Sequence, residues 1–341
     1  MGEKAFITGT QVAAQLTGRP DASVARRARR RPCEVPSCGR EVMVFPVEGP
    51  EDLPGIHPDL IGPALRPGER LRSLVYAPIW DGDEAAFGIR GERASHSVAV
   101  TDGRFIISRS FHRKGRPPDV QAVPLDQVLV VETGSSLLPG WFAVRFADSD
   151  ELRTESFLYE ATYGREHFAA LVHEYRAAAG PTRPLPATQP RPAWSELWRR
   201  VSPRQAGRLR PVVCQDETLL AFTTSSQTWG TRRSLFGSVP ACAAEEGVLV
   251  VTDHGFMHIV NEPDLRPDLW SFGINVCCIP HGALRSCAIV ERVSVGVSLR
   301  CLRLELGRGS VSWRVDVPFD AQCATSAVRL TQMWKGWESH E

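Results

Sequence analysis

The chain has 341 residues, of which 43% are hydrophobic and 23% are charged, as is usual for a globular protein of two or three domains. Its formal net charge of +1 excludes an overall attraction to nucleic acid or to an anionic membrane. No stretch approaches the roughly 20 apolar residues that span a bilayer, and the N-terminus lacks a secretory apolar core. We therefore expect a cytoplasmic protein that is at most peripheral at a membrane.

Residues 1–63 form an N-terminal extension that we expect to be partly disordered, because apolar clusters are few and prolines and glycines are frequent. The segment 41–47 predicts one short strand that ends near Pro46. The basic run ARRARRR at 25–31 lacks interleaved aromatic residues and lies in no recognisable nucleic-acid-binding motif. We therefore expect no nucleic-acid partner.

Residues 64–179 form the first predicted domain. From Glu69 onward, short β-rich runs alternate with turns that are rich in Asp, Gly and Pro. Over residues 164–180 the spacing of apolar residues predicts a helix, since Phe168, Leu171, Val172 and Tyr175 follow the spacing i, i+3, i+4, i+7. The domain therefore consists of strands first and one helix last.

Residues 180–210 form a connector with seven basic residues and one acidic residue, and five prolines make its first part a stiff linker. A short amphipathic helix follows, with two tryptophans on its apolar stripe and two arginines off it. Such a composition is typical of a helix at a membrane interface or in contact with a partner, and the alternative is packing onto a neighbouring domain. The candidate residues are Trp194, Trp198, Arg199 and Arg200.

The second predicted domain, residues 211–341, repeats the pattern of the first. The segment 97–108 matches 248–259, with alternating apolar residues, a Thr-Asp pair, two turn residues and an aromatic residue. In chain order, the residue numbers differ by 148 and 149 in the first matched segment and by 151, 156 and 160 in the next three, and each half ends in a candidate helix. Differences that grow in this way are typical of loop insertions between equivalent strands.

Both halves share a strand that ends in Thr-Asp, a turn followed by an aromatic residue, a Val-Pro or Ile-Pro pair at a strand end and a terminal helix. In these features each half resembles the bacterial PH-like and GRAM-like domains. The resemblance implies a mainly β (α+β) fold of two tandem PH-like split β-barrels. Each barrel would be a bent seven-stranded sheet that a C-terminal helix closes. Such domains bind lipid head groups, peptides or other subunits and rarely catalyse reactions. The motif residues are Val100, Thr101, Asp102, Arg104, Phe105 and Pro124 in the first copy and Val251, Thr252, Asp253, Phe256 and Pro280 in the second.

A basic loop of the first copy is the candidate ligand site. Its cations can hold a phosphate or an acidic peptide through charge-assisted hydrogen bonds. Two alternatives remain open: a solvated hairpin tip, or attraction to the corresponding acidic loop of the second copy. The basic residues are Arg109, His112, Arg113, Lys114 and Arg116, and the acidic ones are Glu262, Asp264 and Asp268.

The sequence shows no recognisable catalytic arrangement. The spacing of Cys33 and Cys38 does not match a zinc site, and a cytosolic chain keeps its nine cysteines reduced. Cys277 and Cys278 lie near His281, but neighbouring residues of a strand point to opposite faces, so we expect both thiols to be buried core groups. We therefore expect no catalytic residues, metal or cofactor.

These observations favour a non-enzymatic adaptor or assembly protein that binds protein partners through PH-like modules, with self-association as one form of partner binding. The alternative is a peripheral membrane protein that binds anionic lipid head groups through the basic loop of the first domain.

Overall fold

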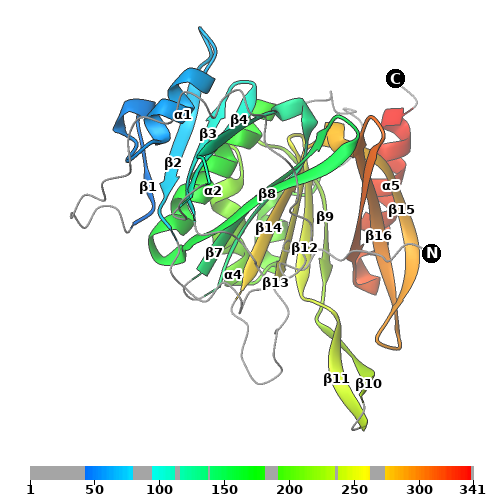
Figure 1. Ribbon diagram of the computed structural model, residues 1–341. Helices are drawn as coiled ribbons and strands as arrows, with labels where there is room; N and C mark the ends of the chain where they lie inside the picture. Colours follow the sequence, from blue (N-terminus) through cyan, green and yellow to red (C-terminus); the bar gives the residue numbers. More distant parts are fainter. Residues whose placement is uncertain are drawn as a thin grey trace.

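The computed structural model describes residues 43–79, 94–111, 116–136, 139–180, 191–234, 237–261 and 273–338 (Figure 1). The fold is mainly β, and its strands pair antiparallel in sheets of five, seven, three and two strands. The expectation of a mainly β protein with a helix at the end of each half is thus confirmed. Most of the predicted N-terminal extension and of the Pro-rich linker lies outside the described residues.

The first half begins with a two-residue strand and a short helix, and seven further strands and a long helix follow. Its elements are β1 (Phe45–Pro46), η3 (Pro50–Asp52), α1 (His57–Ala64), β2 (Leu71–Ala77), β3 (Ala94–Thr101), β4 (Arg104–Phe111), β5 (Asp119–Pro124), η5 (Leu125–Gln127), β6 (Val128–Ser135), β7 (Pro139–Asp148), β8 (Glu151–Glu160) and α2 (Ala161–Ala179).

The second half repeats this order after two connector helices, with one additional hairpin. Its elements are α3 (Trp194–Arg200), α4 (Pro203–Leu209), η6 (Arg210–Val212), β9 (Leu219–Ser225), β10 (Thr228–Ser234), β11 (Gly237–Ala244), β12 (Gly247–Thr252), β13 (Gly255–Asn261), β14 (Ile274–Ile279), η7 (His281–Ala283), β15 (Leu284–Ser294), β16 (Val297–Arg308), β17 (Val311–Pro318), η8 (Ala321–Cys323) and α5 (Ala324–Glu338).

The strand registers reproduce the repeat that the sequence predicts. Residues that are equivalent by sequence occupy the same positions in the ladders, and their numbers differ by 148, 151, 156 and 160 along the chain. The two halves therefore share one strand order and one register. The corresponding pairs are Leu71–Thr101 and Leu219–Thr252, Phe105–Val123 and Phe256–Ile279, and Val128–Phe146 and Leu284–Leu306.

A single seven-stranded sheet joins the two halves. Its order is β8-β7-β6-β14-β13-β12-β9, so three strands come from the first half and four from the second. The junction is the antiparallel pair β6–β14, in which Glu132 lies opposite Cys277. In Figure 1 this sheet lies between the five-stranded sheet β1-β2-β3-β4-β5 and the three-stranded sheet β15-β16-β17.

Both faces of the seven-stranded sheet are buried, because strand side chains alternate between two cores. On β14, Val276 and Cys278 belong to the core that α2, α3 and α4 cover, whereas Cys277 and Ile279 belong to the core under β15–β17 and α5. Cys277 and Cys278 therefore point to opposite faces and are both buried, as the sequence predicts.

Residues 43–64 are part of the first half's packing. Ile61 of α1 is completely buried against Leu74 and Ile106, on the outer face of the five-stranded sheet. In the second half, α4 lies against β13 and β14 as α1 lies against β4 and β5. The repeated unit thus includes a helix before the strands, which was not expected from the sequence.

Candidate functional site

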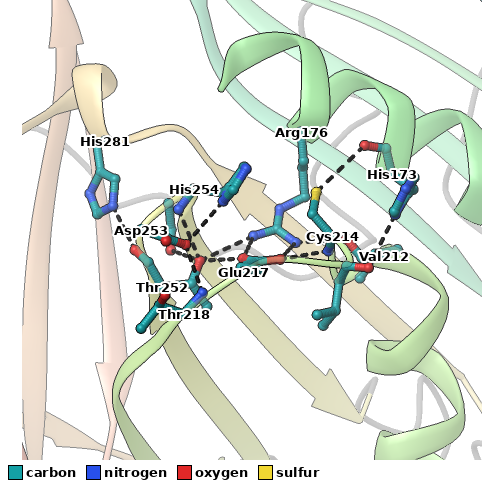
Figure 2. A network of polar contacts seen from close by, with 12 residues as sticks. His173, Arg176, Val212, Cys214, Glu217, Thr218, Thr252, Asp253, His254 and His281 are labelled. Carbon is teal, nitrogen blue, oxygen red and sulfur yellow. Dashed lines mark hydrogen bonds and ion pairs between the residues drawn. The ribbon is translucent and has the colours of Figure 1, made fainter. Parts of the chain in front are cut away.

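The most deeply buried ion pair of the described chain lies between the two halves (Figure 2). Glu217, just before β9, is the acceptor for four donors and its side chain is fully buried. Arg176 of α2 donates through Nη1 to Oε2 at 3.0 Å and through Nη2 to Oε1. The backbone N–H of Cys214 donates to Oε2 at 2.7 Å, and the Thr252 hydroxyl donates to Oε1.

The packing of α2 places Arg176 at this position. Phe168, Leu171 and Tyr175 are buried in the shared core, and Arg176 follows them in the last turn of the helix. Its Nη1 also donates to the Val212 carbonyl O at 2.6 Å. Burial alone would lower the pKa of Arg176, but the surrounding charges and hydrogen bonds, including those of Glu217, raise it overall. The guanidinium therefore stays charged in a dry environment.

The first half contains an equivalent network on its own residues. Arg104 Nε donates to Glu69 Oε1 at 2.9 Å, and Thr101 donates to the same oxygen at 2.7 Å. Arg104 Nη2 donates to the Ala64 carbonyl O at 2.9 Å, as Arg176 does to Val212. The hydrogen bonds that Glu69 accepts, from Arg104 foremost and also from Thr101 and the Arg66 N–H, lower the pKa of Glu69 to about 2.

The two networks differ in the origin of their arginine. The position equivalent to Arg104 is Gly255, whose φ of +133° is unfavourable for other residues. A Cβ at Gly255 would also overlap with the Ile279 carbonyl O. The second half therefore lacks an arginine at this point, and Arg176 of the first half supplies it.

A cation would not fit this network, although three potential ligands are close together. Ligand atoms of Glu217, Asp253 and His254 lie within 4.8 Å of one another. Both Glu217 oxygens already accept hydrogen bonds from the Arg176 guanidinium, whose charge repels a metal ion. Asp253 accepts a hydrogen bond from the Thr218 N–H at 3.0 Å. The three residues are therefore engaged in hydrogen bonds that stabilise the fold.

The predicted basic loop is described only at its ends. Arg109 is neutralised by Asp119, at 2.7 and 2.9 Å, and by Glu155 of β8, at 2.6 Å. The Arg116 guanidinium lies over the Phe111 ring, 3.9 Å from its centroid. The other predicted ligand residues, His112, Arg113 and Lys114, lie outside the described residues, as do the acidic residues Glu262, Asp264 and Asp268.

The predicted tryptophan helix is α3, and its tryptophans contact the second half. Trp194 and Trp198 stack at 5.4 Å between ring centroids, and both pack against the shared core. Trp194 Nε1 donates to the Glu217 carbonyl O at 3.0 Å. Arg199 and Arg200 are exposed, and Arg200 lies 3.7 Å from Glu196 and 5.8 Å from the Phe222 ring centroid. The two tryptophans therefore hold the connector against β9.

Cys278, which is close to His281 in the sequence, is a buried core residue. Burial raises the pKa of Cys278 to about 12, so its thiolate is strongly disfavoured. His281 Nε2 donates to the Thr252 carbonyl O at 2.7 Å. The Cys278 thiol is therefore protonated at neutral pH, and the His281 ring is anchored to the end of β12.

Three buried histidines are not singled out by the sequence, and burial lowers the pKa of each; one of them is His96, which stacks on Phe157. His57 of α1 makes hydrogen bonds with Ser108 at 2.7 Å and Ser95 at 2.9 Å, and burial lowers its pKa to about 4. His258 of β13 is equally buried, and burial lowers its pKa to about 4 as well. The three histidines are therefore neutral at physiological pH.

No protein-family model matches the chain, and no curated protein matches it either. In the described residues, no helix is long and apolar enough to cross a bilayer.

Proposed function

We propose that this chain is a non-enzymatic adaptor or assembly protein, in which two PH-like units form one rigid body that binds protein partners. The observation that carries this proposal is that the buried ion pairs Arg176–Glu217 and Arg104–Glu69 join structural elements to one another. In addition, the buried thiols of Cys278 and Cys287 are protonated, because burial raises their pKa. Apart from β1 and the β10–β11 hairpin, each half has four strands, a 3-10 turn, three strands and a helix, and this shared order supports the PH-like assignment. A scaffold of this kind offers surfaces for binding rather than a reactive centre.

The experiment is affinity purification of the full chain at native expression, followed by chemical cross-linking and mass spectrometry. The expected result is a defined partner in stoichiometric amount, with cross-links that map to this chain. A monodisperse monomer without a stoichiometric partner would contradict the proposal. Purification in buffers of rising salt concentration separates specific partners from charge-driven contaminants.

The alternative, lipid binding by the loop at 109–116, has less support at its described end. Arg109 is already paired with two carboxylates, so its charge is not available to a head group without breaking those bonds. The alternative rests on the residues of that loop that are not described.

A further inference from the structure

The β10–β11 hairpin carries a positive charge that the described residues do not neutralise. It lies between β9 and β12 and extends away from the body of the protein, as Figure 1 shows. Residues 228–244 contain two arginines and no acidic residue, and both arginines are exposed. Neither Arg232 nor Arg233 pairs with a carboxylate of the described residues, whereas the exposed Arg153 pairs with Asp148. The hairpin therefore offers two free cations to a partner.

The hairpin is held in a fixed direction, and both of its edges are protected against the addition of another strand. The Thr231 N–H donates to the Val295 carbonyl O at 3.1 Å, in the turn between β15 and β16. Gly230 permits this approach, since a Cβ there would overlap with the same carbonyl oxygen. Thr231 lies opposite Pro240, whose nitrogen faces the outer edge of β11 and has no hydrogen to donate. Binding at this hairpin must therefore use side chains rather than backbone pairing.

A surface of opposite charge lies on the segment that contains β1, η3 and α1. Residues 43–65 contain four acidic residues and no lysine or arginine, and all four carboxylates are exposed. None of them pairs with a lysine or arginine of the described residues, whereas the exposed Asp102 pairs with Arg72. Since η3 packs against α1, the carboxylates of both helices belong to one surface. The acidic residues are Glu48, Glu51, Asp52 and Asp59.

Each of these two surfaces occurs in one half of the chain only. The difference of 148 that relates β2 to β9 places residues 191–213 at the position of 43–65, and they contain six arginines and one glutamate. The connection between β2 and β3, residues 78–93, contains four acidic residues and two arginines. One chain therefore carries one basic hairpin and one acidic segment, and Figure 1 shows them at opposite ends of the molecule. Because the hairpin is held in place, it does not reach the acidic segment of its own chain.

We propose that the β10–β11 hairpin of one chain docks onto the acidic segment 43–65 of a second copy, so that the chains associate head to tail. Arg232 and Arg233 then face the carboxylates of η3 and α1, and each charge obtains the counter-charge that its own chain does not supply. Exposed apolar side chains accompany both surfaces: Trp229 at the base of the hairpin is 52% exposed, and Met43 at the start of the acidic segment is 41% exposed. A contact between two different surfaces leaves one of each unused in a dimer, so it permits longer chains or closed rings. This inference rests on the proposed protein-binding role and names one partner for it.

The test is sedimentation velocity of the full chain over a range of protein concentrations, at low and at high salt. At low salt, we expect the weight-average sedimentation coefficient to rise with concentration. Added salt is expected to return it to the monomer value, because screening weakens exposed ion pairs. The variants Arg232→Glu/Arg233→Glu and Glu51→Lys/Asp52→Lys are each expected to raise the dissociation constant at least about tenfold.

A mixture of the two variants distinguishes a head-to-tail contact from a contact between identical surfaces. An equimolar mixture is expected to associate although neither variant does so alone, because each chain brings the surface that the other has lost. The urea midpoints of both variants are expected to match the wild type, since the substituted side chains are exposed. The matched control is Arg199→Glu/Arg200→Glu, which reverses two adjacent exposed arginines on α3 and is expected to associate like the wild type.

The inference is overturned if only one of the two variants loses association, if their mixture stays monomeric, or if the α3 variant loses association as well. A wild-type chain that stays monomeric at low salt also overturns it. If that monomer purifies with a different protein in stoichiometric amount, the proposed function is retained and only the head-to-tail contact is wrong. A monomer without any protein partner contradicts both.

Discussion

The Arg176 guanidinium and the Glu217 carboxylate form a bidentate ion pair that links the last turn of α2 to the start of the second repeat. The exposed fractions of the two side chains are 3% and 0%, so each charge is compensated by the other and by neighbouring hydrogen bonds rather than by water.

Removal of one partner is expected to destabilise the protein strongly. We expect Arg176→Met to lower the free energy of unfolding by about 3–5 kcal/mol, because Glu217 then remains buried without its counter-charge. Urea unfolding at neutral pH measures this change. The double variant Arg176→Met/Glu217→Gln is expected to lose less than the single variant. Arg153→Met, at an exposed ion pair with Asp148, serves as the control and is expected to change stability by less than about 1 kcal/mol. A loss at Arg176 as small as that of the control would contradict a structural role.

The two equivalent networks are expected to respond differently in hydrogen exchange. Arg104→Met should raise exchange around Glu69, just before β2, in the β3–β4 turn that contains Arg104, and near Ala64, since its guanidinium bonds Glu69 and the Ala64 carbonyl. Arg176→Met should raise exchange at the end of α2 and also around Thr252 in the other half. Mass spectrometry of peptic fragments resolves these regions. Equal and global effects of both variants would argue against the separation of the networks.

Acid is expected to weaken the fold before most carboxylates titrate. Burial lowers the pKa of both His57 and His258 from 6.5 to about 4, so the unfolded state binds protons more readily than the folded state between these values. The stability that the neutral histidines contribute is complete above pH 6.5 and is lost as the pH falls toward 4. Each histidine contributes up to about 3 kcal/mol to this loss.

The pH effect is measured by urea unfolding at several pH values between 7.5 and 4.5. His258→Leu is expected to flatten the profile, because leucine binds no proton. The profile of the variant would match that of the wild type if His258 titrated normally in the folded state.

Replacement of Gly134, near the junction between the halves, is expected to lower the stability of the protein. A Cβ at Gly134 would overlap with the Trp141 ring on the neighbouring strand, and that ring is held by the bond from Trp141 Nε1 to Asn275 on β14, at 3.1 Å. We expect Gly134→Ala to destabilise by about 1–3 kcal/mol through this overlap.

The matched control is Gly207→Ala in α4, where a Cβ meets no atom within 4 Å. There we expect a gain of up to about 1 kcal/mol, since alanine favours the helix. Thermal unfolding compares the two variants. Equal effects at both positions would rule out a steric cause.

The repeat could be predicted from the sequence because its signals are local. The Thr-Asp pair and the following turn recur with the same neighbours, and the side chains of Thr101 and Thr252 make the same bonds in both halves. The helix α2 follows from its apolar spacing alone. By contrast, α1 contains Pro58 and Pro63 and has no clear periodic pattern, so only its packing against the sheet stabilises it.

The contacts between the halves could not be predicted in the same way. The run of apolar residues in β6 indicates a strand but does not show which strands pair with it. Its pairing with β14 of the other half depends on the whole fold. The sequence does not show that Arg109 is paired, because its partners lie 10 residues away on the neighbouring strand β5 and 46 residues away on β8 of the other sheet. Arg176 likewise resembles an ordinary solvated arginine beside an apolar stripe.

The second repeat has Gly255 where the first repeat has Arg104, and this difference affects how the protein folds during translation. The ribosome releases the first half before the second, and that half carries both Arg104 for itself and Arg176 for its successor. The N-terminal half can complete its polar network while translation continues, whereas the C-terminal half completes its own only on a preformed neighbour. The later-made half thus depends on the earlier-made half for its polar network, and the reverse does not hold.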